Sequence, residues 1–245
     1  MYSNGYIFRY ASIVVILAAA FLSMASVLLK PFQERNRAID KMQGILAAAQ
    51  VKGVTSDNAI PLFNKYIVNE EIIDSTGNVV ESYTKAVKEN APAFNIDLAT
   101  ELYNQSKHKP YKLPIYIAQK DGQKIYIIPM RGTGLWGPIW GNIALTANFK
   151  TVIGVFFDDE SETPGLGGEI AQLPFQNQFI GKTIFDNQGD FTSVSVVKGG
   201  IQKMSPADRI HGVDAISGGT LTSNGVNAML HDVLTLYLPY MKKNN

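Results

Sequence analysis

The sequence contains no cysteine among its 245 residues. This absence excludes a thiol nucleophile, a disulfide, a thiolate-bound iron–sulfur cluster and a c-type haem. Histidine is also scarce: the three histidines, His108, His211 and His231, are far apart in the sequence and show no metal-ligand spacing. We therefore predict no metal site and interpret these histidines as surface or capping residues.

The sequence also lacks the patterns typical of nucleic-acid binding, dinucleotide binding and serine hydrolases. Charged residues make up 18% of the chain, the formal net charge is +1, and the basic residues form no cluster of the kind that binds nucleic acid. No G-x-G-x-x-G motif stands between a predicted strand and a predicted helix, which argues against a dinucleotide-binding fold. No Ser-His-Asp pattern is recognisable. We predict no nucleic-acid partner and no catalytic residues that act without a cofactor.

A long apolar run stands near the N-terminus. Residues 10–29, YASIVVILAAAFLSMASVLL, carry no charge and lie between Arg9 and Lys30. A helix of about 20 apolar residues spans a bilayer, whereas a signal peptide has an apolar region of about 7–15 residues before a small-residue cleavage site. The charged segment that follows has no such site. We predict an N-terminal tail over residues 1–9, a single transmembrane helix over 10–29, and a globular domain over 30–245.

The side of the membrane on which this domain lies stays open at this point. The basic residues after the span, Lys30, Arg35, Arg37 and Lys41, outnumber those before it. Counted directly, this bias places the domain in the cytoplasm, but long domains translocate largely regardless of charge.

The rest of the chain mixes helical and strand patterns without a regular βαβ alternation, which predicts an α+β domain. Pro31 is expected in the first turn of a helix that stops near Gly53. An Asp-Gly turn at residues 120–123 predicts a hairpin. The other predicted elements are a helix at 58–67, a hairpin of 70–74 with 79–83, strands at 113–119 and 124–130, strands within 147–159 and 192–198, and a last helix at 224–238.

Three segments are unusual for connections. They are residues 131–140 (RGTGLWGPIW), 162–169 (ETPGLGGE) and 214–226 (DAISGGTLTSNGV). Aromatic and aliphatic side chains can hold a flat ring, glycines allow close approach of the backbone, and hydroxyls beside a helix start can hold a phosphate. Together the three segments favour a site for flavin mononucleotide (FMN).

Each of these features also has a purely structural interpretation. Trp136 and Trp140 are the only tryptophans, and tryptophan is common in cores and interfaces. The hydroxyls could cap the last helix, although a cap needs only one of them. Glu162 and Glu169 could form a carboxylate pair, but we interpret them as residues that structure their loop.

The stretch from Asp214 to Thr220, D-A-I-S-G-G-T, resembles the flavinylation motif of proteins that carry FMN covalently. With LTSNGV, ETPGLGGE, GLWGPIWG and VVKGG, it is similar to one family: the C subunit of the bacterial Na+-translocating NADH:quinone oxidoreductase. The resemblance covers most of the chain and is sharpest over residues 131–230. One departure is Gly219, where the family usually has alanine.

This resemblance implies that the Thr220 hydroxyl forms a phosphodiester with FMN, installed by a separate flavin transferase that uses FAD and Mg2+. It further implies that Leu135 and Trp136 contact the ring. Lys198 either places a positive charge near the flavin or is a solvated lysine at the end of a strand. The other implied contacts are Asp214, Ser217, Gly218, Gly219, Leu221 and Thr222 on the Thr220 segment, and Thr163, Leu166 and Gly167 on the ETPGLGGE segment.

The family also implies a function. The chain would be an electron-transfer subunit, in the bacterial inner membrane, of a complex that oxidises NADH, reduces ubiquinone and exports Na+, with its partner subunits beside it and its soluble domain in the periplasm. One alternative is the G subunit of an Rnf electron-transport complex, which also carries FMN on a threonine. The other is a membrane-tethered binding module without a redox role.

Overall fold

The computed structural model describes residues 3–84 and 91–244. The chain divides into two units, Met1–Lys41 and Met42–Asn245. The described part of the first unit is helical and belongs to α1 (Asn4–Ala48), which is long and apolar enough to cross a membrane. Its side chains over residues 10–29 are almost all exposed, as expected for an apolar segment that packs against none of the other residues described.

Two predictions about this helix are wrong. Pro31 lies in its interior and not in a first turn, since the helix begins at Asn4. The helix also ends at Ala48, before Gly53. Gln50 adopts a left-handed φ of +57°, and the N–H groups of Gln50 and Val51 donate to the carbonyls of Ala47 and Leu46. This is the usual helix-ending motif, formed here by a glutamine instead of the glycine that a sequence search looks for.

The second unit is built on a six-stranded antiparallel sheet with the order β2-β1-β3-β4-β5-β6. A short parallel pair, β7-β8, lies outside it. This arrangement confirms the α+β prediction. The strands are β1 (Ile67–Asp74), β2 (Val79–Thr84), β3 (Lys112–Lys120), β4 (Gln123–Thr133), β5 (Pro138–Thr146), β6 (Val152–Asp159), β7 (Ser195–Val197) and β8 (Gly212–Asp214).

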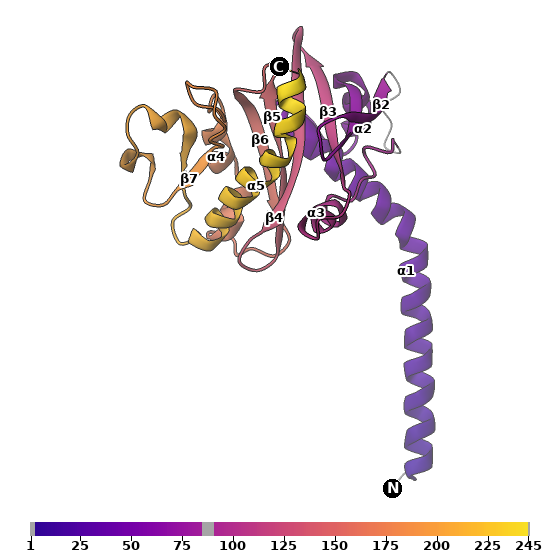
Figure 1. Ribbon diagram of the computed structural model, residues 1–245. Coiled ribbons are helices and arrows are strands. Elements are labelled where there is room, and N and C mark those ends of the chain that lie inside the picture. Colours follow the sequence, from indigo (N-terminus) through magenta and orange to yellow (C-terminus); the bar gives the residue numbers. More distant parts are fainter. Residues whose placement is uncertain (1–2, 85–90, 245) are drawn as a thin grey trace. The chain divides into compact units, whose positions relative to one another are not determined.

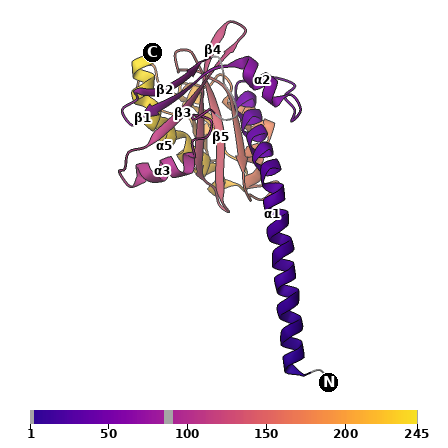
Figure 2. The same ribbon diagram turned by 90° about the vertical axis from the view of Figure 1, so that its right-hand side faces the viewer.

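Both faces of the sheet are covered, so its central strands read as continuous apolar runs. On one face lies α5 (Thr220–Asn244), which crosses β4 (Figure 1) and packs Met229 and Tyr237 into the main core. The other face is covered by the end of α1 from Met42 onward (Figure 2) and by α2 (Ala59–Tyr66). On that face Phe63, Phe94 and Tyr116 meet edge to face.

The remaining helices are short and lie between strands. They are α3 (Leu98–Ser106), η1 (Gly167–Ala171), α4 (Leu173–Gln176), η2 (Asn177–Phe179), η3 (Ile201–Lys203) and η4 (Asp208–His211). None of them was predicted from the sequence. The hairpins β1/β2 and β3/β4, the helix α2 and the final helix were predicted and are confirmed, but α5 begins at Thr220 and not at residue 224.

The prediction of a loop over residues 131–140 is wrong. β4 continues to Thr133 and β5 begins at Pro138, so the connection is only residues 134–137, and Trp140 pairs with Arg131 in the sheet. Of the three glycines that suggested a loop, Gly132 lies in β4 and allows close packing: a Cβ there would lie 2.8 Å from Met229 Cβ.

Two glycines in the turns of the sheet test how closely α5 packs against the β1/β2 hairpin. Gly77 and Gly122 each have φ of +77°, but a Cβ on Gly77 would lie 2.3 Å from the Tyr240 nitrogen, whereas Gly122 has nothing within 4 Å. Alanine at either position costs about 1–2 kcal/mol for the left-handed conformation. We expect Gly77→Ala to cost about 1–3 kcal/mol more than Gly122→Ala, because α5 must also move. Thermal unfolding of the full chain in detergent checks this, and equal losses would contradict the packing.

Candidate functional site

The three unusual segments of the sequence meet at the start of α5. They enclose a cavity of about 290 Å³. The loop between β4 and β5 forms one wall, the segment after β6 forms a second, and the first turn of α5 with the residues before it forms a third. The lining residues are Leu135, Trp136, Glu162, Thr163, Leu166, Gly167, Gly218, Gly219, Thr220, Leu221 and Thr222.

The side chain of Glu162 joins these three walls. It is buried, its Oε1 accepts a hydrogen bond from the Trp136 N–H at 2.9 Å, and its Oε2 accepts one from the Thr222 hydroxyl at 2.6 Å. A Cβ on Gly134 or Gly167 would lie 2.3 or 2.1 Å from the carboxylate oxygens. These two glycines therefore make room for Glu162. The prediction that Glu162 structures its loop is confirmed.

The hydroxyl groups of this region differ in whether they are already engaged in hydrogen bonds. Thr222 is buried in the bond just described, and the buried Ser223 Oγ accepts a hydrogen bond from the Ile216 N–H at 3.1 Å. Thr220 is half-buried on the cavity wall, and its hydroxyl makes no hydrogen bond with any residue that the structure describes. Thr163 lies exposed on the facing wall. Thr220 and Thr163 are thus the cavity hydroxyls that remain open to chemistry.

The backbone around Thr220 suits an anion. Thr220 is the first residue of α5, and the first N–H groups of a helix have no partner within it and lie at the positive end of its dipole. Gly218 adopts φ of +76°, a conformation that favours glycine. Gly219 is less open than the sequence suggests: a Cβ there would lie 3.0 Å from Ile216 Cγ2 and 3.2 Å from the Leu166 carbonyl oxygen.

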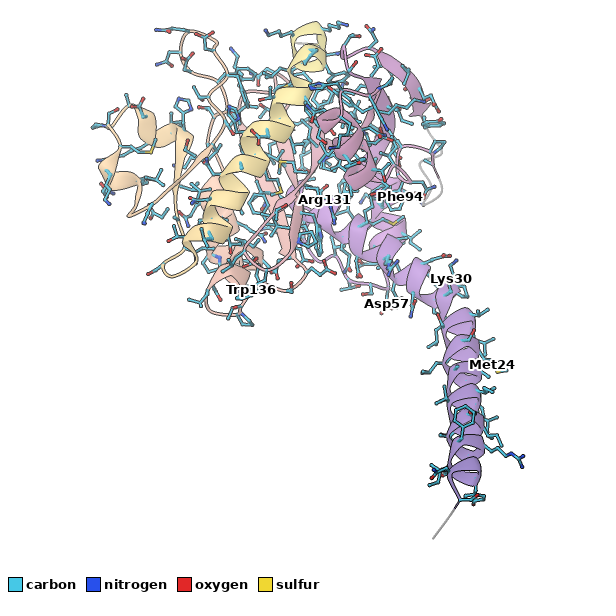
Figure 3. All side chains as sticks on the ribbon, turned by 60° about the horizontal axis from the view of Figure 1, so that its bottom comes forward. Met24, Lys30, Asp57, Phe94, Arg131 and Trp136 are labelled. Atoms are coloured by element: carbon cyan, nitrogen blue, oxygen red, sulfur yellow. The ribbon has the colours of Figure 1, made fainter. Side chains whose placement is uncertain are left out.

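The rim of the cavity is apolar and exposed. Trp136, at the outer end of the β4–β5 loop (Figure 3), is 65% exposed, and Leu135, Leu166 and Leu221 are 49%, 43% and 59% exposed. Single exposed apolar side chains are ordinary, but a group around one cavity marks a surface that binds something apolar. These four side chains can support a flat ring while the cavity holds a more polar group.

Three predicted site residues do not line the cavity. The Asp214 carboxylate accepts a hydrogen bond from the Ile201 N–H at 2.7 Å, so it holds the loop after β7. Ser217 is exposed just before the lining residues, and Lys198 is exposed at the end of β7. Contacts of these residues with a cofactor stay predictions. The positive charge expected from Lys198 is not on the cavity wall.

The size of the cavity limits what it can enclose. Ligand sites usually measure about 300–1,000 Å³, so this cavity is at the small end of that range, and part of a bound mononucleotide would rest on the apolar rim. A larger hollow of about 610 Å³ lies between α3, β4 and α5, but none of the predicted site residues lines it. Among the residues described, no group of three or more His, Asp or Glu could hold a metal ion.

Comparison with known proteins identifies the same region. Residues 134–235, which include the whole cavity lining, match the FMN-binding domain family. The C subunit of the Na(+)-translocating NADH-quinone reductase of Pseudomonas aeruginosa is 33% identical over 90% of this chain and 87% of its own length. That of Neisseria meningitidis serogroup A is 32% identical over 94% and 90%.

The solved structures that this chain resembles are of the same subunit as these relatives. The crystal structure of the C subunit of the Na(+)-translocating NADH-quinone reductase from Parabacteroides distasonis has 37% identity and a TM-score of 0.75, covering 89% of this chain and 98% of that one. The NqrC protein of Shewanella oneidensis has 25% identity and a TM-score of 0.67, covering 86% and 99%.

Replacing Glu162 tests its structural role. Glu162→Ala would leave the Trp136 N–H and the Thr222 hydroxyl without their acceptor. We expect a loss of about 2–4 kcal/mol in unfolding free energy, since each buried group left unpaired costs about 1–3 kcal/mol. Glu160 is exposed on the same segment, and Glu160→Ala is expected to change stability by less than about 0.5 kcal/mol. Thermal unfolding of both variants measures this difference in stability. Equal melting temperatures would contradict the structural role of Glu162.

Proposed function

We propose that this chain, which belongs to the family of the C subunit of the Na+-translocating NADH-quinone reductase, carries FMN covalently on Thr220 and transfers electrons within that complex. The observation that carries the proposal is the position of Thr220. It is an available hydroxyl, on the wall of a cavity, at the positive end of a long helix, inside the FMN-binding domain.

The attachment is a group transfer from FAD by a separate transferase. The Thr220 oxygen forms a bond to the phosphorus of the FMN half, the pyrophosphate bond of FAD breaks, AMP leaves, and the hydroxyl proton passes to a base of the transferase. The product is a phosphodiester with one negative charge. The free N–H groups at the start of α5 and the open backbone at Gly218 stabilise that charge.

The residues of this chain position the cofactor and shield part of it. When bound, FMN supplies the electron-transfer chemistry. The Trp136 and Leu166 side chains, which lie on two different loops, would support the ring, and Glu162 ties those loops together. Because the rim is exposed, the ring edge remains accessible to electron donors and acceptors on partner subunits. No acid–base pair is required for this role.

The helix α1 fits a membrane anchor in this scheme. We place residues 1–9 in the cytoplasm, 10–29 in the bacterial inner membrane, and the domain 30–245 in the periplasm, where partner subunits of the complex that oxidises NADH, reduces quinone and exports Na+ would meet it. The G subunit of an Rnf complex is the alternative. The two relatives named above and the Parabacteroides distasonis structure are all C subunits of the Na+-translocating reductase, which favours the first assignment.

The attachment site is tested with Thr220→Val, made together with a flavin transferase. The change removes the hydroxyl and nearly preserves the shape, so we expect a folded protein without covalent FMN. The matched control is Thr235→Val, which changes an exposed threonine on the same helix. Intact mass and fluorescence of the denatured protein in a gel measure the attachment. Covalent FMN on Thr220→Val, or its loss in Thr163→Val alone, would show that another hydroxyl is used.

The side of the membrane is tested with a single cysteine. The chain has none, and Lys242 is exposed in the last turn of α5, so Lys242→Cys offers one accessible thiol. We expect a membrane-impermeant maleimide to label it in intact spheroplasts. Labelling only after lysis would place the domain in the cytoplasm, as the charge count of residues 30–41 suggests. The denatured protein serves as the control that the thiol reacts.

A further inference from the structure

The wall of the cavity carries a negative charge of its own. Of the described residues that line it, Glu162 is the only ionisable one, and none carries a positive charge. The remaining lining residues are apolar side chains, glycines and threonines. A cofactor whose charge changes during its reaction would therefore face a carboxylate that no cationic side chain of the lining compensates.

The surroundings of Glu162 hold it as an acceptor without neutralising it. Its two hydrogen bonds come from a backbone N–H and a hydroxyl, both of which are uncharged donors. Within the described part of the chain, the ion pairs do not include Glu162. The side chain is 7% exposed, so solvent and salt screen its charge far less than that of a surface carboxylate.

We infer that Glu162 lowers the reduction potential of the flavin that this cavity receives, in addition to holding the three loops together. This inference rests on the proposed attachment of FMN to Thr220. Each electron that a donor delivers to the ring adds one negative charge, which remains unless a proton from water follows. A buried carboxylate in the cavity, below the apolar rim that would support the ring, opposes that added charge and has little effect on the uncharged oxidised ring.

The consequence concerns the direction of electron flow. A lower potential makes the reduced cofactor a stronger donor to whatever carrier accepts its electrons. Hydrogen bonding alone does not require a charge here. A glutamine oxygen could accept from the Trp136 N–H, and its amide could donate to the Thr222 oxygen, so the two functions of Glu162 can be separated by substitution.

The experiment is a potentiometric titration of the full flavinylated chain in detergent, with mediators and an electrode as the electron source. Glu162→Gln removes the charge and keeps the shape, and we expect it to favour the reduced flavin at least tenfold, which is about 59 mV for a one-electron step. Glu162→Asp keeps the charge and disturbs the hydrogen bonds. It should therefore lower the melting temperature and shift the equilibrium between oxidised and reduced flavin less than threefold. Glu160→Gln removes an exposed charge on the same segment and should shift it less than twofold.

A second pair of variants covers the case in which Glu162→Gln does not fold. Thr163 is exposed and lines the same cavity, so Thr163→Lys adds a positive charge without touching Glu162, and Thr163→Gln is its neutral control. We expect the lysine variant to raise the potential above that of the glutamine variant, which has a side chain of similar length and no charge. The inference is overturned if Glu162→Gln folds and leaves the potential unchanged, if Glu162→Gln and Glu162→Asp shift it equally, or if Glu162→Gln does not fold and Thr163→Lys leaves the potential unchanged.

Failure of this inference and failure of the proposed function give different results. Fluorescence of the denatured wild-type protein establishes first that the flavin is covalent, independently of its potential. A protein that is dark after denaturation contradicts the attachment to Thr220. If the denatured protein is fluorescent but Glu162→Gln leaves the reduction potential unchanged, only the electrostatic role of Glu162 is contradicted.

Discussion

The candidate site depends on one buried carboxylate. The Glu162 side chain bonds to a residue 26 positions earlier and to another 60 positions later, and so ties the β4–β5 loop to the first turn of α5. Burying a carboxylate is unfavourable unless its oxygens find donors, and here each oxygen has one. The glycines at 134 and 167 are required because any side chain there would occupy the space of the carboxylate. The shape of the cavity follows from this arrangement.

The sheet and α5 fix where this arrangement is placed. Gly132 and Gly225 let β4 and α5 approach closely: a Cβ on Gly225 would lie 2.2 Å from the Thr133 carbonyl oxygen, and one on Gly132 would lie 2.8 Å from Met229 Cβ. This contact holds the start of α5 beside the end of β4. Thr220 therefore stands opposite the β4–β5 loop because of core packing, and the site residues need only short connections to reach it.

Parts of the fold and of the candidate site could be predicted from the sequence, and other parts could not. The Asp121-Gly122 pair is a local signal, so it gave the hairpin of β3 and β4 correctly. The three Gly-rich segments were also grouped correctly, since a small, hydroxylated composition is unusual for ordinary connections. The strand β5 was missed because Gly132, Gly134 and Gly137 made the whole of residues 131–140 look like a loop, although Gly132 lies in β4 and serves close packing. The partners of Glu162 are set by tertiary structure, and no local pattern encodes a contact across 60 residues.

The small size of the cavity bears on why a covalent bond would serve this protein. Affinity for a free cofactor depends largely on how much of its surface is enclosed, and this cavity of about 290 Å³ is small and has an exposed rim. A deeper pocket would bind more tightly but would also bury the ring edge through which electrons enter and leave. The proposed phosphodiester at Thr220 would remove that conflict, because retention would no longer depend on enclosure. The exposed rim could then stay open to partners, while Glu162 remains buried in the cavity wall below it.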